Sequence, residues 1–199
     1  MIIIPELRTV VLQPPRTGST SVRDAVLAKY PLSFMLYRHM EVSGIPRGYE
    51  RWRKICQIRH PVSRLQSVYK YMCNPPVKEH TSQIWLENCK RETSKGFEEW
   101  LVNGQYAFTA NEPNKTDSFR PQYLVDAPIP EQRKSQFYWG HNADEFIHFE
   151  DLEDGVRHFL NVEIEHKNQS EEYCVTESPA IDSFIQKFHA WDLNLYKEY

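Results

Sequence analysis

Residues Pro14 to Ser21, with the sequence P-P-R-T-G-S-T-S, bring together groups that are well suited to holding an anion. Backbone N–H groups at the start of a helix, with the positive end of the helix dipole, attract phosphate or sulfate. A guanidinium adds a charged donor fork that matches such oxygens. The stretch therefore predicts a phosphate-binding loop, and an ordinary turn before an N-capped helix is the alternative. The candidate ligand-binding residues are Arg16, Thr17, Gly18, Ser19, Thr20 and Ser21.

The residues around this loop place it between a strand and a helix. The apolar run Thr9 to Leu12 precedes it, and apolar residues at helical spacing follow it from Val22 to Tyr30. The loop is not a Walker A motif, because Pro14 stands where the first glycine would be and no lysine follows Gly18. It also lacks the G-x-G-x-x-G pattern of dinucleotide-binding folds.

A second set of polar residues follows another predicted strand, Arg53 to Ile58. It reads R-x-P-x-x-R-x-x-S-x-Y from Arg59 to Tyr69, with a helix expected from Pro61. Arg59 leaves the strand end and Ser67 lies about two helical turns later, so both are expected to hold one anion. Arg64 can instead pair with a carboxylate at the edge of the core. The alternative for the whole set is a strand–helix junction with scattered surface charges.

The remaining pattern predicts an α/β protein. Further strands are expected at residues 33–37 and 144–149, and helices at 150–160 and 179–195, the last with Ser178 as N-cap. We expect a three-layer, P-loop-like fold with a central, mainly parallel sheet flanked by helices, forming a single domain over residues 1–199. Loops that follow such strands share one edge of the sheet, which brings His39 toward Arg16 and Arg59. The irregular segment 77–130, with short helices at 84–91 and 97–102, either covers the active site or is a structural insertion.

Composition narrows the class of partner. The 199 residues carry a net charge of −3, which argues against a surface built for nucleic acid. No run approaches the length of a transmembrane helix, and four cysteines without C-x-x-C spacing favour a reducing, cytoplasmic location. No cluster of His, Cys and Asp has metal-ligand spacing, so no metal is expected.

Taken together, the two anion motifs resemble those of the PAPS-dependent sulfotransferases. P-P-R-T-G-S-T-S is similar to the 5′-phosphosulfate loop of that family, with Arg16 where many members carry lysine. I-R-H-P-V-S-R-L-Q-S-V-Y is similar to its 3′-phosphate motif. Weaker matches at residues 119–124, 146–152 and 191–199 resemble the carbohydrate sulfotransferase branch.

The resemblance implies transfer of a sulfuryl group from PAPS to a hydroxyl of a carbohydrate or small molecule, leaving adenosine 3′,5′-bisphosphate. Arg16 and the N–H groups of the loop would stabilise the leaving phosphate. Arg59 and Ser67 would hold the 3′-phosphate. His39 would be the general base, with Glu41 as the second candidate.

Two other functions are weighed against this one. A P-loop-like nucleotide kinase or hydrolase is disfavoured by the missing Walker lysine and by the lack of a clear carboxylate for Mg²⁺. A catalytically inactive nucleotide-binding module is disfavoured by the presence of both Arg16 and His39.

Overall fold

The chain folds into two compact units. The computed structural model describes residues 1–36, 38–77, 83–104, 129–164 and 178–198. Unit 1 contains Met1–His60 and Gln136–Glu171, and unit 2 contains Pro61–Ser135 and Glu172–Tyr199. The single-domain organisation expected from the sequence stays a prediction. Within the described ranges, no helix has the length and apolar character needed to cross a membrane.

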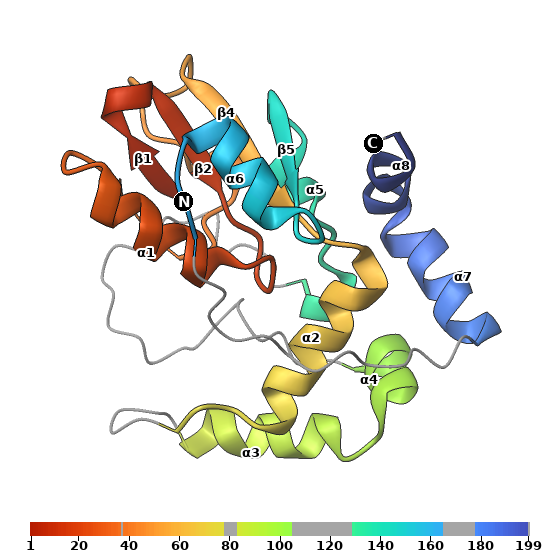
Figure 1. The fold of residues 1–199 in the computed structure, drawn as a ribbon. Coiled ribbons are helices and arrows are strands. Elements are labelled where there is room, and N and C mark those ends of the chain that lie inside the picture. The colour runs from red at the N-terminus through yellow and green to blue at the C-terminus, as the bar shows by residue number, and fades with distance from the viewer. Residues whose placement is uncertain (37, 78–82, 105–128, 165–177, 199) are drawn as a thin grey trace. The chain divides into compact units, whose positions relative to one another are not determined.

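Unit 1 is built on a five-stranded sheet (Figure 1). The order of the strands across the sheet is β3-β1-β2-β4-β5. The strands are β1 (Ile2–Ile4), β2 (Thr9–Leu12), β3 (Phe34–Met35), β4 (Arg53–Ile58) and β5 (Glu145–His148). The central strand β2 is β-branched and fully buried, as expected for a strand covered on both faces.

The sheet is mixed, whereas the sequence predicted a mainly parallel one. β2 is parallel to β4 and β4 is parallel to β5, but β1 is antiparallel to both β2 and β3. The two reversals cancel, so β3 runs in the same direction as β2. The loops that follow β2, β3 and β4 therefore leave the same edge of the sheet, which is the part of the prediction that positions the site.

The strands at the N-terminal side differ most from expectation. β1 was not predicted, because three isoleucines are too short a run to identify a strand from the sequence alone. The strand expected at residues 33–37 consists of Phe34–Met35, and both side chains are exposed at the edge of the sheet. It joins the sheet through β1, in the register Ile2 with Met35 and Ile3 with Phe34.

Two helices pack on one face of this sheet: α1 (Ser19–Lys29) and α6 (Leu152–Leu160) (Figure 1). Their apolar residues and those of the strands form one buried cluster of eleven side chains. Another short helix of unit 1, α5 (Phe137–Gly140), contacts β4 and the 3-10 helix η2 (Val42–Gly44). The structure thus confirms an α/β sheet flanked by helices, while the P-loop-like character stays a prediction.

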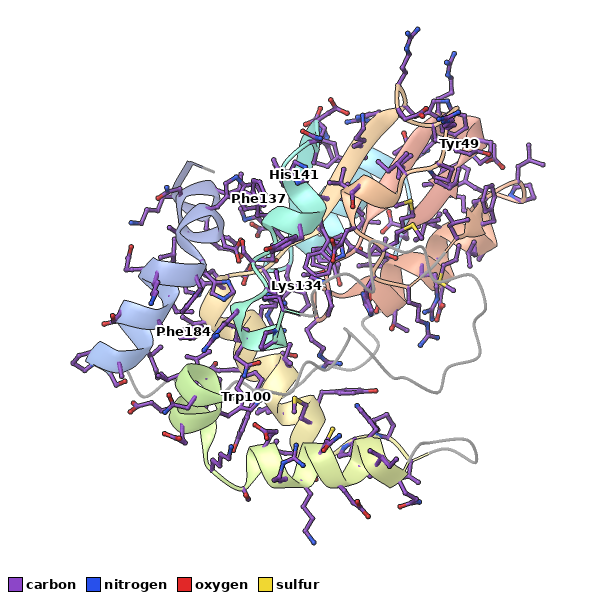
Figure 2. All side chains as sticks on the ribbon, turned by 180° about the vertical axis from the view of Figure 1, so that it is seen from behind. Tyr49, Trp100, Lys134, Phe137, His141 and Phe184 are labelled. Carbon is purple, nitrogen blue, oxygen red and sulfur yellow. The ribbon has the colours of Figure 1, made fainter. Side chains whose placement is uncertain are left out.

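Unit 2 is helical in its described residues. Its elements are α2 (Pro61–Cys73), α3 (Gln83–Thr93), α4 (Phe97–Asn103), η4 (Glu131–Arg133), α7 (Pro179–Phe188) and α8 (Ala190–Glu198). Trp100 and Phe184, labelled in Figure 2, belong to its apolar core. The helices expected at 84–91 and 97–102 are confirmed by α3 and α4. Residues 105–128 lie outside the described part of the chain, so a covering role for segment 77–130 stays a prediction.

The helix predicted over residues 179–195 is two helices. Its start is as expected, because Ser178 Oγ accepts the backbone N–H of Ile181 at 3.2 Å. The break falls at His189, whose φ of −129° ends α7. The imidazole of His189 is fully buried, and its two nitrogens lie 2.9 Å from Asp192 Oδ2 and 2.9 Å from the carbonyl oxygen of Gln132.

Asp192 joins several buried polar groups of unit 2. Besides His189, its carboxylate accepts a 2.5 Å hydrogen bond from Ser135 Oγ. Burial by itself raises the pKa of Asp192, but the hydrogen bond and charge of His189, the charge of Arg64 and the Ser135 hydroxyl together lower it. Arg64 also donates to the backbone carbonyl of Lys134 at 2.6 Å, and its pairing with a carboxylate stays a prediction.

The lowered pKa predicts how Asp192→Asn changes stability with pH. The variant should lose roughly 1.5–3 kcal/mol near neutral pH, the usual worth of a hydrogen bond to a charged group. Because the folded-state pKa lies below the ordinary 3.8, the advantage of the wild type is complete well above pH 3.8. It then shrinks as the pH falls below that value. Urea unfolding between pH 7 and pH 3 measures the difference, with the exposed Asp182→Asn as control, and a constant difference would contradict the assignment.

Candidate functional site

The loop between β2 and α1 ends in a residue with left-handed backbone conformation. Gly18 is the N-cap of α1, with φ 78° and ψ 14°. The cap makes no side-chain hydrogen bond, and the first turn of α1 holds no acidic residue. The positive end of the helix dipole is therefore not neutralised by a carboxylate of that turn, as an anion site requires.

Carbonyl groups of this loop are bound by donors from inside unit 1. Thr17 Oγ1 donates to the carbonyl of Pro14 at 2.8 Å. Gln57 Nε2 donates to the carbonyl of Thr17 at 3.0 Å, and Gln13 Nε2 donates to that of Ser19 at 3.1 Å. In a planar trans peptide the N–H points opposite to the carbonyl. The N–H groups of residues 18 and 20 are thus turned away from the two glutamines.

The hydroxyl groups of the loop have different surroundings. Thr17 is fully buried and its hydroxyl is bound to the loop itself, so Thr17 is suited to contribute its backbone rather than its side chain. Ser21 is also buried. Ser19 and Thr20, by contrast, line a small pocket.

This pocket joins the loop to the candidate base. Its walls come from the loop after β2, from α1, and from β3 and the turn that follows. The lining residues are Gln13, Ser19, Thr20, Arg23, Met35, Arg38 and His39. The structure therefore brings His39 beside Ser19 and Thr20, as the common direction of β2 and β3 requires. Glu41, the second candidate base, is buried and does not line this pocket.

The half-buried imidazole of His39 is held in one orientation. Its Nδ1 lies 2.9 Å from the carbonyl oxygen of Gln13. A carbonyl only accepts, so Nδ1 carries the proton and the lone pair is on Nε2. The backbone of His39 is left-handed, with φ 54°, and its carbonyl accepts Trp139 Nε1–H at 2.9 Å.

The surroundings of His39 keep its imidazole neutral. Burial lowers the pKa of His39 to about 4, against the opposing effect of the Gln13 hydrogen bond and with a smaller contribution from the positive charges of Arg38 and Arg16. At pH 7 the imidazole is therefore uncharged, with the lone pair of Nε2 available to accept a proton.

Arg16 and Arg59 lie next to each other at the same edge of the sheet. Arg59 Nη1 donates to the carbonyl of Arg16 at 3.4 Å, and Arg16 has a left-handed φ of 70°. The guanidinium of Arg59 stacks on the ring of Phe149, with Cζ 4.1 Å from the ring centre. The side-chain amide of Gln136 binds both the N–H and the carbonyl of Arg59, at 2.9 and 2.8 Å. These contacts fix one guanidinium beside the loop.

Ser67, the predicted partner of Arg59, belongs to the other unit. It is buried on α2 in unit 2, whereas Arg59 lies in unit 1. A shared anion held by Arg59 and Ser67 stays a prediction.

Sequence reasoning missed three glutamines: Gln13, Gln57 and Gln136. Each is buried and binds backbone atoms at the carboxyl edge of the sheet. For Gln57 a weak signal existed, since a long polar side chain stands between the apolar Cys56 and Ile58. Its partners, however, depend on the pairing of β4 with β2.

Comparison of the chain with models of protein families, with curated proteins and with solved structures found no match. Among the residues that the structure describes, no three His, Cys, Asp or Glu side chains gather in a way that would hold a metal ion.

The packing around Gly18 predicts a large effect of Gly18→Ala. A Cβ at this position would lie 2.5 Å from Leu152 Cδ2 and 3.4 Å from the ring of Phe149, in addition to the strain of a left-handed alanine. Overpacking of this kind costs typically about 1–3 kcal/mol. Gly48→Ala is the matched control, because Gly48 also has a positive φ (98°) but no atom within 4 Å of the added Cβ. Thermal unfolding of both variants should show the larger loss for Gly18→Ala, and equal losses would rule out the close packing.

Proposed function

We propose that this chain is a PAPS-dependent sulfotransferase that transfers a sulfuryl group to a hydroxyl of an acceptor, a carbohydrate or small molecule. One observation carries the proposal: His39, with its lone pair on Nε2, shares a pocket with Ser19 and Thr20 of the anion loop. A base and an anion-binding helix end beside each other are what transfer of a charged group to a hydroxyl requires. The two sequence motifs that resemble this family add to the proposal.

In the proposed reaction, the acceptor oxygen forms a bond to sulfur while the bond from sulfur to the bridging phosphate oxygen breaks. The hydroxyl proton moves to Nε2 of His39. The electron pair of the broken bond stays on the 5′-phosphate oxygen of adenosine 3′,5′-bisphosphate. Arg16 and the N–H groups at the start of α1 would stabilise that oxygen, which makes them the electrostatic part of catalysis.

Arg59 would bind the 3′-phosphate of the donor. Its guanidinium is fixed by the stack on Phe149 and the hydrogen bond to Arg16, so little side-chain entropy would be lost on binding. Ser67 would donate a second hydrogen bond to the same phosphate. The absence of a lysine after Gly18 favours this donor over a nucleoside triphosphate.

Donor recognition is tested by binding and by transfer. Adenosine 3′,5′-bisphosphate at a hundredfold excess over its Kd should stabilise the protein by roughly 2.7 kcal/mol, and ATP by much less. Thermal unfolding measures the stabilisation by each nucleotide. Transfer is measured with labelled sulfate from PAPS and a panel of hydroxyl acceptors. Equal stabilisation by ATP would favour a kinase or hydrolase, and bisphosphate binding without transfer to any acceptor would favour an inactive nucleotide-binding module.

The role of His39 is tested separately. His39→Ala should keep the affinity for the bisphosphate and lose roughly 10²–10⁴ in turnover, the usual worth of a positioned base. Since the pKa of His39 is about 4, kcat/KM of the wild type should stay level from pH 8 to about pH 5 and fall below that as the imidazole gains a proton. His141→Ala, an exposed histidine of unit 1, is the control. Turnover near wild type in His39→Ala, with a loss in Glu41→Gln, would move the role to Glu41.

A further inference from the structure

Two buried glutamines form a continuous hydrogen-bond chain beneath the anion loop. Gln57 is fully buried on β4, and Gln13 follows β2. Gln57 Oε1 accepts from Gln13 Nε2 at 2.6 Å, while Gln57 Nε2 donates to the carbonyl of Thr17 at 3.0 Å. Gln13 Nε2 also donates to the carbonyl of Ser19 at 3.1 Å. Each of these donors thus has an acceptor on the loop or on the other glutamine.

Gln13 also connects the loop to the base. Its backbone carbonyl accepts Nδ1–H of His39 at 2.9 Å, which places the lone pair on Nε2. Gln57 is therefore hydrogen-bonded to Gln13, whose side chain binds the loop and whose backbone carbonyl binds His39. Gln57 itself is not among the residues that line the pocket.

We propose that Gln57 is a positioning residue for the anion loop and, through Gln13, for His39. This inference rests on the proposed sulfotransferase function for its effect on turnover, but not for its effect on the loop. Gln57 acts by holding the carbonyl of Thr17 inward, which fixes the direction of the next N–H group, that of Gly18. Stabilisation of a developing charge requires donors that are already oriented before reaction, so a loosened loop loses catalytic power.

The chemistry of a neutral amide explains why this position suits glutamine. Gln57 must donate to one carbonyl and accept from one amide, and it must do so without charge. A carboxylate would face the carbonyl of Thr17 and place a negative charge close to the anion. An apolar side chain would leave the carbonyl of Thr17 and the amide of Gln13 without this partner, and such buried groups are costly.

The test uses Gln57→Met, which keeps the length and apolar packing of the side chain, and Gln57→Glu, which keeps the acceptor but not the donor. Gln132→Met is the matched control, because Gln132 is equally buried in unit 2 and donates to the carbonyl of Trp100. Four quantities are measured for each variant: thermal stability, hydrogen exchange of the amides at residues 17–23, Kd for adenosine 3′,5′-bisphosphate, and kcat.

Both Gln57 variants should show faster amide exchange at residues 17–23, roughly tenfold weaker binding of the bisphosphate and up to roughly 10²-fold lower kcat. The double variant Gln13→Met/Gln57→Met should lose less than the two single losses combined, because the two side chains share one hydrogen bond. Gln132→Met should lose stability without changing loop exchange, Kd or kcat.

The outcomes separate this inference from the proposed function. Unchanged exchange at residues 17–23 in both folded Gln57 variants would overturn the positioning role, whatever the activity. If the wild type neither binds the bisphosphate nor transfers sulfate, the proposed function fails, and faster loop exchange in the variants would still support the positioning role. If Gln57→Met does not fold, Gln57→Glu decides in the same way.

Discussion

The conformation of the loop from Pro14 to Ser21 depends on which donors its carbonyl groups bind. The carbonyls of residues 14, 17 and 19 accept hydrogen bonds from a threonine hydroxyl and from two buried glutamines. An unpaired buried carbonyl would cost about 1–3 kcal/mol, so these bonds fix the orientation of the peptide groups. Because the donors are neutral, they add no charge to the positive end of the α1 dipole and the nearby arginines.

The site combines several features that disfavour folding when taken alone. Arg16 and His39 both have left-handed backbones, a conformation in which side chains crowd the backbone. Burial also disfavours the charged form of His39. These costs are offset by the apolar cluster that α1 and α6 form on the sheet, in which Val11, Ile55 and Val156 are fully buried. A strained backbone and a histidine with a lowered pKa often occur together at functional sites.

The sequence predicted those features that are determined by residues close together in the chain. The loop, α1, β5 and the cap at Ser178 have composition and spacing that act over a few residues, and they were found. β1 and the roles of Gln13 and Gln57 depend on which strands pair and in what register, which adjacent residues do not specify. The break at His189 was hidden because apolar residues continue at helical spacing on both sides of it. The direction of β3 was expected correctly, although its neighbour is β1 and not a parallel strand.

Because β1 lies between β2 and β3, the strand that precedes His39 is not a direct neighbour of the strand that precedes Gln13. Neighbouring strands lie about 4.8 Å apart, so β3 is roughly 10 Å from β2 and the chain must cross the start of β1 before His39 can reach Gln13. Among the described strands, β3 pairs with β1, and none of the residues of β1 lines the pocket. A strand that contributes no side chain to the pocket therefore sets the distance that the chain spans between β3 and Gln13. Substitutions in Ile2–Ile4 can thus displace the imidazole without touching it.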